Sequence, residues 1–338
     1  MPIPPLQREP HRILILHLGS LAEVILSLPA LHAVRERFAR AHLTLLATEP
    51  ACETVAMTSL MDEYVPVATQ RLRQLATPWG AYRWLRLPRY LRQQSYNWVL
   101  DLPSYSSTSL LTKVTQARVH WSLHPSMRIA NLLGYVWPPR SAPRQHVLER
   151  YLGLIRSWGI QPTQRRPVLP LSLDVRDAID KQLRQKGYHR DRLLIGLYPQ
   201  AAHGLRQWPP DWFVALGERL NHDLAVRLLL ASHLKKDRII RQVAKQVAEA
   251  ITLQGLTMPE LAAAMAACTL LVTDDPGLAN LAAAVQTPVL GLGLNASLAP
   301  RGDEHRMIQP GRFASTLEEA VATITEMVTR QRSTTLFQ

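Results

Sequence analysis

The sequence predicts an α/β protein with two halves, each built on a parallel sheet. Three observations carry this prediction: short apolar runs alternate with stretches of helical spacing, the alternation occurs twice along the chain, and a segment rich in proline and arginine separates the two series. Strands that alternate with helices form βαβ units and parallel sheets. A chain of 338 residues is also long enough to form two cores.

The first half carries three predicted strands and two predicted helices. The strands cover residues 13–17, 43–47 and 98–102, and the helices cover residues 21–38 and 85–94. The first run is apolar or nearly so throughout, which is typical of a strand buried on both faces. Val24, Leu28 and Leu31 follow it at a spacing of three to four residues, which indicates one face of a helix.

The second half repeats this pattern. Predicted strands cover residues 193–198, 225–230, 269–273 and 289–292, and predicted helices cover residues 211–220, 236–248, 259–267 and 278–284. A terminal helix is predicted over residues 315–330, where Ser315 and Glu318 have the spacing of a capping box. The prolines and arginines of residues 159–173 predict an extended connector. The predicted division is a domain of residues 1–165, a linker of residues 166–185 and a domain of residues 186–338.

The composition is that of a globular protein, with 47% hydrophobic and 19% charged residues. No apolar run reaches the roughly 18 residues of a membrane-spanning helix, and the N-terminal segment lacks a secretory pattern, so we expect a cytoplasmic protein. Cys52 and Cys268 belong to no disulfide or metal-binding pattern, and no metal site is predicted. The formal charge of +13 favours an anionic partner such as nucleic acid, a phosphorylated substrate or an acidic membrane face.

The turn after the first strand is the first candidate site. The apolar run breaks at Gly19, and Ser20 and Glu23 then open the helix. A helix that starts at the carboxyl edge of a parallel sheet points its positive end at the region where ligands of open α/β folds bind. Two interpretations of Glu23 stay open: its carboxylate closes a capping box with Ser20, or it takes a proton from an attacking hydroxyl as a general base.

A second candidate site follows the strand at 269–273. Asp274 and Asp275 end this strand, and Pro276 and Gly277 begin a helix of small residues. Pro276 suits the first helical turn, and either aspartate suits the N-cap, so a well-capped helix is one interpretation. A ligand site is the other.

A third candidate lies in the loop after the strand at 193–198, which holds His203, Gly204 and Arg206. A guanidinium can hold a phosphate through two parallel hydrogen bonds, which favours a phosphate-binding role for Arg206. By itself, a single arginine in a loop is more often a solvated surface residue.

These three segments together resemble glycosyltransferase family 9, the family of the ADP-heptose:lipopolysaccharide heptosyltransferases. The resemblance covers almost the whole chain, with the same order and spacing of motifs. The motifs are the opening strand with its LG…LSLPAL turn and helix, YNWVLDL at 96–102, HVLERYLGLIRSWGI before the linker, QWPPDWF, LQGLTMPELAAAMAACTLLVTDD and GLANLAAAVQTPVL.

The resemblance implies a GT-B fold, in which two Rossmann-like domains face a central cleft and the C-terminal helix packs on the body. It implies that the C-terminal domain holds the nucleotide-sugar, that the N-terminal domain holds the acceptor, and that the transfer is inverting, metal-independent and needs no cofactor. Glu23 stands at the position of the family's aspartate base, and Arg206 stands at that of a lysine that neutralises the diphosphate.

The implied donor site is the start of the helix after the second candidate turn. Asp275, Pro276 and Gly277 match a motif that contacts the sugar and phosphates, and Leu278 and Asn280 belong to the adjoining helix start. Here the sequence departs from the family pattern, because Pro276 replaces a hydroxyl residue and Asn280 replaces histidine. Elsewhere, Glu23 replaces aspartate, Ala22 replaces glycine, and residues 294–298 replace a Gly-Pro-Thr-Asp-Pro loop.

The predicted acceptor site contains Gly19 and Ser20 of the first turn together with His146 and Arg150. The last two are spaced i, i+4 on one helix face. The resemblance implies that basic residues of this region lie near the acceptor, whereas solvent-facing charge is the alternative interpretation.

A basic and aromatic stretch between residues 64 and 100 fits an anionic glycolipid acceptor at the inner membrane surface. A solvated helix is the alternative interpretation, and the sequence shows no nucleic-acid-binding signature. The side chains of this stretch are Arg71, Arg73, Trp79, Tyr82, Arg83, Trp84, Arg86, Arg89, Tyr90 and Arg92.

The function implied by the resemblance is transfer of a heptose from ADP-heptose to a lipopolysaccharide inner-core acceptor. Two alternatives stay open. The chain is a catalytically impaired family member that binds a nucleotide-sugar or lipid, or it is a transferase that uses another nucleotide-sugar.

Overall fold

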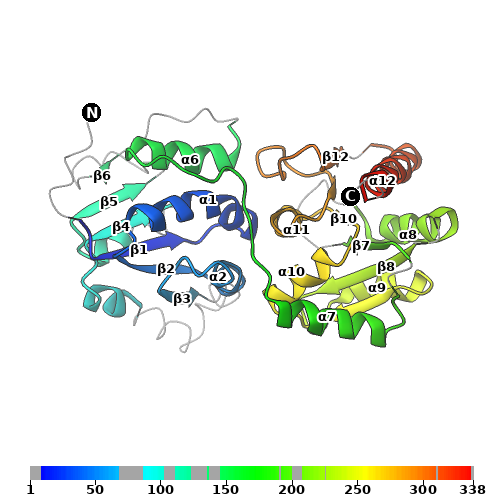
Figure 1. Ribbon diagram of the computed structural model, residues 1–338, viewed down its shortest axis with the longest axis horizontal. Helices are drawn as coiled ribbons and strands as arrows, with labels where there is room; N and C mark the ends of the chain where they lie inside the picture. Colours follow the sequence, from blue (N-terminus) through cyan, green and yellow to red (C-terminus); the bar gives the residue numbers. More distant parts are fainter. Residues whose placement is uncertain are drawn as a thin grey trace. The chain divides into compact units, whose positions relative to one another are not determined.

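The computed structural model describes residues 9–67, 87–102, 111–122, 135–136, 145–189, 192–199, 208–224, 226–309 and 311–335. The chain divides into two compact units, Met1–Pro167 and Val168–Gln338. Each unit contains a six-stranded sheet with helices packed on it (Figure 1). Every strand pair in both sheets is parallel, as the sequence predicts for βαβ units.

The N-terminal unit has the strand order β3-β2-β1-β4-β5-β6. Its strands are β1 (Arg12–His17), β2 (His42–Thr48), β3 (Glu63–Val67), β4 (Trp98–Asp101), β5 (Val119–Ser122) and β6 (Tyr135–Val136). Its helices include α1 (Leu21–Arg37), α2 (Glu49–Ala56) and α6 (Val147–Ser157), and residues 87–93 and 111–114 are helical as well. The chain runs outward from β1 in both directions, which makes β1 the switch point of the sheet.

Burial on both faces explains why the first predicted strand forms. The four aliphatic side chains from Ile13 to Leu16 are 0% exposed, and each contributes roughly 1.5–3 kcal/mol through burial. Helix α1 packs against both α2 and α6, and therefore buries residues on most of its circumference.

The C-terminal unit has the strand order β12-β11-β10-β7-β8-β9, with the switch point at β7 and β10. Its strands are β7 (Leu194–Tyr198), β8 (Arg227–Ser232), β9 (Ile251–Gln254), β10 (Leu270–Thr273), β11 (Val289–Leu292) and β12 (Arg306–Ile308). Its helices are α7 (Leu173–Gln185), α8 (Pro210–Leu224), α9 (Arg238–Gln246), α10 (Met258–Ala266), α11 (Pro276–Ala284) and α12 (Phe313–Thr335).

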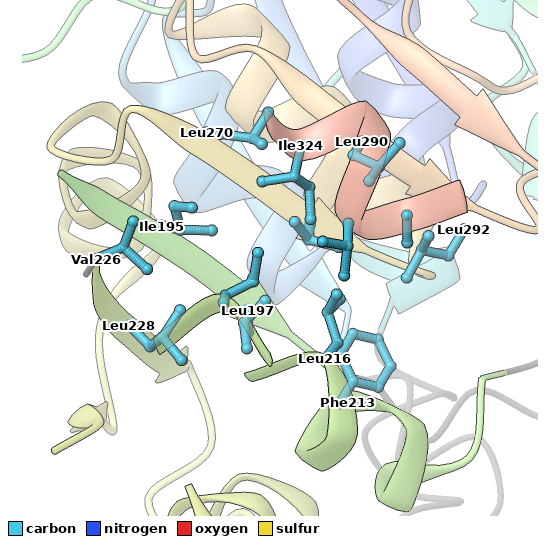
Figure 2. Packing of buried hydrophobic residues seen from close by; sticks show 14 of the residues in the cluster. Ile195, Leu197, Phe213, Leu216, Val226, Leu228, Leu270, Leu290, Leu292 and Ile324 are labelled. Atoms are coloured by element: carbon cyan, nitrogen blue, oxygen red, sulfur yellow. The ribbon is translucent and has the colours of Figure 1, made fainter. Parts of the chain in front are cut away.

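One face of this second sheet is covered by α8 and α12, which pack against each other. Figure 2 shows Ile195 and Leu197 of β7 facing the same core as Phe213 of α8 and Ile324 of α12. The C-terminal helix thus packs on the body of its unit, as predicted. It begins at Phe313, so the predicted capping box at Ser315 is wrong; the hydroxyl of Ser315 instead donates to the Arg312 carbonyl at 2.9 Å.

The segment between the two sheets is extended only in part. Residues 160–172 form neither helix nor strand, but α7 begins at Leu173 with Ser172 as its N-cap, inside the predicted linker. The Thr163 hydroxyl lies 3.0 Å from a carboxylate oxygen of Glu36, and the Leu169 amide donates to the Ala284 carbonyl at 2.9 Å. Both ends of the extended stretch are therefore tied to a neighbouring helix.

None of the helices in the described parts of the chain is long and apolar enough to cross a membrane.

Candidate functional site

The first candidate site lies where β1 ends and α1 begins, at the switch point of the N-terminal sheet. Ser20 is the N-cap of α1, and its amide and hydroxyl both donate to Oε2 of Glu23, at 2.8 and 2.9 Å. The Glu23 amide lies 3.4 Å from the Ser20 hydroxyl, which completes a capping box. The capping-box interpretation of Glu23 is confirmed, and the carboxylate is held at the helix start with its side chain half-buried.

At Gly19 two side chains lie close to the backbone. A Cβ atom at this position would lie 2.9 Å from Oε2 of Glu23 and 3.1 Å from Cε1 of His17. A contact under 3.0 Å forces one of these groups to shift, so no larger residue fits without moving the carboxylate or the imidazole.

His17 is a site residue that the sequence reasoning missed. It is the last residue of β1, it is 0% exposed, and its ring lies 5.6 Å from that of Tyr151 on α6. Burial lowers its pKa from 6.5 to about 4, against the opposing effect of the Glu23 carboxylate. The signal in the sequence is a titratable residue at the end of an apolar strand, directly before a glycine turn.

His146 and Arg150 lie at the start of α6, the helix that packs beside α1. His146 is the N-cap, and its Nδ1 accepts from the Leu148 amide at 3.2 Å. At 7% exposure this side chain is buried, so the solvent-facing interpretation is wrong for His146. Arg150 is half-buried in the first turn. Through the contact of Tyr151 with His17, the start of α6 belongs to the same region as Glu23.

The second candidate site lies where β10 ends and α11 begins, at the switch point of the C-terminal sheet. Asp275 is the N-cap, and its Oδ1 accepts from the Leu278 amide at 2.7 Å. Burial raises the pKa of Asp275, while hydrogen bonds from the Leu278 and Gly277 amides and nearby His233 oppose that rise. The cap interpretation is confirmed, and the two amides that an anion would use already have an acceptor.

Pro276 and Asn280 complete this helix start. Pro276 occupies the first helical position and supplies no N–H group. The amide nitrogen of Asn280 donates to the carbonyls of Pro276 and Leu298, each at 2.7 Å, and the residue is 2% exposed. Asn280 therefore ties α11 to the loop after β11, in the region where the family's Gly-Pro-Thr-Asp-Pro loop is absent.

A family model described as glycosyltransferase family 9 (heptosyltransferase) matches residues 84–294, which is more than half of the chain. This chain belongs to glycosyltransferase family 9. The family 9 chain is therefore a glycosyltransferase of the heptosyltransferase family, and the resemblance noted in the sequence is confirmed. The second candidate turn lies inside the matched range, whereas Glu23 lies before it.

Known relatives of this family 9 glycosyltransferase are similar along most of its length. Lipopolysaccharide heptosyltransferase 1 of Pseudomonas aeruginosa is 25% identical over 296 residues, which are 83% of this chain and 78% of the relative. A family 9 glycosyl transferase from Veillonella parvula has a TM-score of 0.78 at 17% identity, over 95% of this chain and 97% of its own. E. coli heptosyltransferase WaaC with ADP has a TM-score of 0.73 at 19% identity, over 94% of this chain and 99% of its own. The predicted GT-B fold is confirmed.

Other predicted residues of this family 9 glycosyltransferase fall outside the part that the structure describes. Arg206, His203 and Gly204 lie in the undescribed range 200–207. Of the basic and aromatic stretch, the structure describes only Arg89, Tyr90 and Arg92. No group of three or more histidine, cysteine or acidic side chains placed to hold a metal ion occurs in the described ranges.

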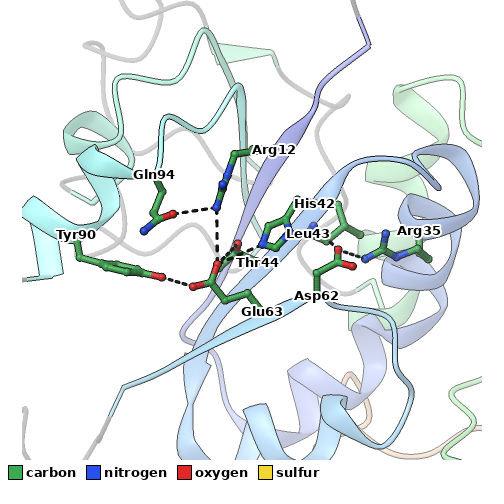
Figure 3. Close-up of polar contacts among 9 residues, drawn as sticks. All are labelled: Arg12, Arg35, His42, Leu43, Thr44, Asp62, Glu63, Tyr90 and Gln94. Atoms are coloured by element: carbon green, nitrogen blue, oxygen red, sulfur yellow. Dashed lines mark hydrogen bonds and ion pairs between the residues drawn. The ribbon is translucent and has the colours of Figure 1, made fainter.

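Tyr90 takes part in a polar cluster at the opposite end of the N-terminal sheet (Figure 3). Its hydroxyl donates to Glu63, which also contacts Nε2 of His42 at 3.3 Å and the Thr44 hydroxyl at 3.1 Å. Burial alone would raise the pKa of Glu63, but these three hydrogen bonds hold it below its ordinary value. Because His42 and Glu63 are the first residues of β2 and β3, the cluster stabilises the amino edge of the sheet, away from Gly19.

Proposed function

We propose that this glycosyltransferase moves a heptose from ADP-heptose to an anionic lipopolysaccharide inner-core acceptor, with inversion and without a metal ion. The observation that carries the proposal is the Glu23 carboxylate, held by Ser20 at the carboxyl edge of β1. Ligands of open α/β sheets bind at such switch points. The named activity of the Pseudomonas relative supports the choice of substrates.

In the proposed reaction Glu23 takes the proton of the acceptor hydroxyl. The hydroxyl oxygen attacks the anomeric carbon of the heptose from the face opposite the diphosphate, the bond from that carbon to the diphosphate oxygen breaks, and ADP leaves. A positioned general base contributes typically 10²- to 10⁴-fold to such a step. The side chain of Glu23 is one methylene longer than the aspartate of the family pattern, and Ser20 fixes one of its carboxylate oxygens.

Donor binding is proposed for the start of α11, with Asp275, Pro276, Gly277, Leu278 and Asn280. Arg206 neutralises the leaving diphosphate in this proposal, as the charge on a guanidinium can do. The WaaC structure holds ADP, which supports a nucleotide donor for this chain.

Acceptor binding is proposed for Gly19, Ser20, His146 and Arg150. Arg150 supplies positive charge to an anionic acceptor, and the formal charge of +13 favours contact with the inner membrane surface from the cytoplasmic side. Nucleic acid is not a partner in this proposal.

The test is release of ADP from ADP-heptose in the presence of a purified inner-core acceptor. Glu23→Ala should lower the rate by at least 100-fold, because it removes the base. Glu260→Ala is the matched control, since Glu260 closes an equivalent capping box with Thr257 at the start of α10. Equal rates for the wild type and Glu23→Ala would remove Glu23 from the mechanism.

A second candidate function is nucleotide-sugar or lipid binding without efficient transfer. The observation that favours it is the α11 start, where Asp275 occupies the amides of Gly277 and Leu278 and Pro276 has none to offer. Calorimetry with ADP separates the cases in part, because a donor site that has lost its phosphate contacts should not bind ADP. A panel of nucleotide-sugars in the same assay tests whether the donor is another sugar.

A further inference from the structure

His17 is a buried imidazole without a hydrogen-bond partner in the described ranges. Both ring nitrogens are buried and unsatisfied, and the residue is 0% exposed. An unsatisfied ring nitrogen in a core costs roughly 1–3 kcal/mol. A buried polar group in this condition requires an explanation, and a part in catalysis is one that fits a ring beside the candidate base.

The ring of His17 and the carboxylate of Glu23 both lie close to Gly19. The position that a Cβ of Gly19 would take lies 2.9 Å from Oε2 of Glu23 and 3.2 Å from Nδ1 of His17. Both groups therefore border the space that a side chain at Gly19 would fill. Tyr151 lies against the ring and limits its movement.

The imidazole is neutral at physiological pH, because burial lowers its pKa to about 4. A neutral imidazole carries one N–H donor and one nitrogen that accepts. An acceptor nitrogen adds nothing to an ionised carboxylate, which has no proton to donate. It does stabilise a protonated carboxyl group, which has one.

We propose that His17 is a positioning residue for Glu23, whose ring nitrogen accepts a hydrogen bond from the Glu23 carboxyl once that group has taken the proton of the acceptor hydroxyl. The inference rests on the proposed function, because it assigns His17 a part in the proton transfer to Glu23.

The proton balance is complete without any other reactant. The O–H bond of the acceptor breaks and an O–H bond forms on Glu23. The electron pair left on the acceptor oxygen forms the new bond to the sugar carbon. The Glu23 proton stays on oxygen and is shared with the His17 nitrogen as a hydrogen bond. The proton returns to water after ADP leaves.

The first experiment compares rates in a double-mutant cycle. His17→Leu should lower kcat about tenfold with little change in KM, because one hydrogen bond in the transition state is lost. His17→Gln keeps an acceptor oxygen and should recover part of the rate. In a Glu23→Gln background, His17→Leu should have no further effect, since His17 acts through the carboxyl group. Equal losses in both backgrounds would overturn the proposal.

A stability measurement separates this role from a structural one. His17→Leu replaces an unsatisfied polar side chain with an apolar one in an apolar site, so it should raise the Tm while it lowers kcat. A structural histidine would lower both. A variant with a lower Tm and a proportional loss of activity would therefore contradict the inference.

Nuclear magnetic resonance of the ¹⁵N-labelled histidines gives a readout that needs no activity. Glu23→Gln should shift the ring-nitrogen signals of His17, and Glu260→Gln should leave them unchanged. Unchanged signals in Glu23→Gln would overturn the pairing of the two residues. If Glu23→Gln shifts the His17 signals but the wild type has no transferase activity, the proposed transfer is wrong, and so is the role of His17 in it. The proximity of His17 and Glu23 would still stand.

Discussion

Two helices in this molecule begin with the same kind of capping box, but the surroundings of the two boxes differ. At the start of α1, the Ser20 amide and hydroxyl donate to Oε2 of Glu23 at 2.8 and 2.9 Å. At the start of α10, the Thr257 amide and hydroxyl donate to Oε2 of Glu260, each at 2.8 Å. Helix capping alone therefore accounts for the geometry of both carboxylates.

The surroundings separate the two helix starts. Helix α10 follows β9 at the edge of its sheet, whereas α1 follows β1 at the switch point. The glycines before the two helices also differ. Gly255 has a φ of +75°, which favours glycine for its backbone. At Gly19, an added Cβ would crowd the side chains of His17 and Glu23. A cap explains Glu260 fully, but it explains neither the unsatisfied imidazole nor the crowding at Gly19.

The largest expected difference is between Glu23→Gln and Glu260→Gln. Both variants keep a side-chain oxygen that can close the capping box, since glutamine also serves at this position, so both should change the unfolding free energy only slightly and by a similar amount. Only Glu23→Gln should lower the transfer rate, by roughly 10²- to 10⁴-fold. Urea titration and the ADP-release assay measure the two effects. Similar transfer rates for both variants would mean that Glu23 only caps helix α1.

Gly19→Ala should lower the transfer rate by on the order of 100-fold, because its Cβ forces the carboxylate or the imidazole out of place. Gly153→Ala on α6 is the control, since a Cβ there meets nothing within 4 Å. It should stabilise the helix by roughly 0.5–1 kcal/mol and leave the rate unchanged. Steady-state kinetics of both variants measure these transfer rates. Full activity in Gly19→Ala would mean that the crowding at this position has no catalytic importance.

The stability of the N-terminal unit should depend on pH through His17. Its pKa is about 4 in the folded protein and has its ordinary value of 6.5 in the unfolded chain, so the unfolded state binds more protons between these values. Stability is then complete above about pH 6.5 and falls as the pH drops toward 4. Between pH 7 and pH 5 the loss should be about 2 kcal/mol. Urea titrations at both values check this, and His17→Leu should abolish this part of the loss.

The smallest effect is expected at α11. Asp275→Ala removes the N-cap and should lower the unfolding free energy by about 1 kcal/mol, as should Thr257→Ala at α10. Only Asp275→Ala should weaken the binding of ADP-heptose, because only the α11 start is proposed to hold the donor. Calorimetry measures the affinity. Equal affinity in the two variants would argue against a donor site at α11.

Much of the fold was predictable because its strands are nearly continuous apolar runs bounded by turns. Strand β11 was predicted to the residue, and β1, β7 and β10 to within one residue. Strand β9 and helix α7 were not predicted. Residues 251–254 bury only alternate side chains, and α7 is a polar helix that buries only Ile179 and Leu183. Short or polar elements hold their place through tertiary contacts that a local pattern does not contain.

The candidate site was predictable only in part. Spacing identified the caps at Glu23 and Asp275, because a cap is a local interaction. His17 was missed because its surroundings include Tyr151, which is more than a hundred residues away in sequence. The contact of Asn280 with Leu298 was missed for the same reason, since it depends on how a loop folds back over α11.

The hydrogen bonds of Thr163 to Glu36 and of Leu169 to Ala284 fasten the chain on either side of a very short span. Within residues 164–168, Pro167 has its φ fixed by the pyrrolidine ring and restricts the residue before it. These restrictions limit how the backbone of the connecting segment can rearrange. A glycine in place of Pro167 would remove them without changing any residue that is proposed to bind substrate.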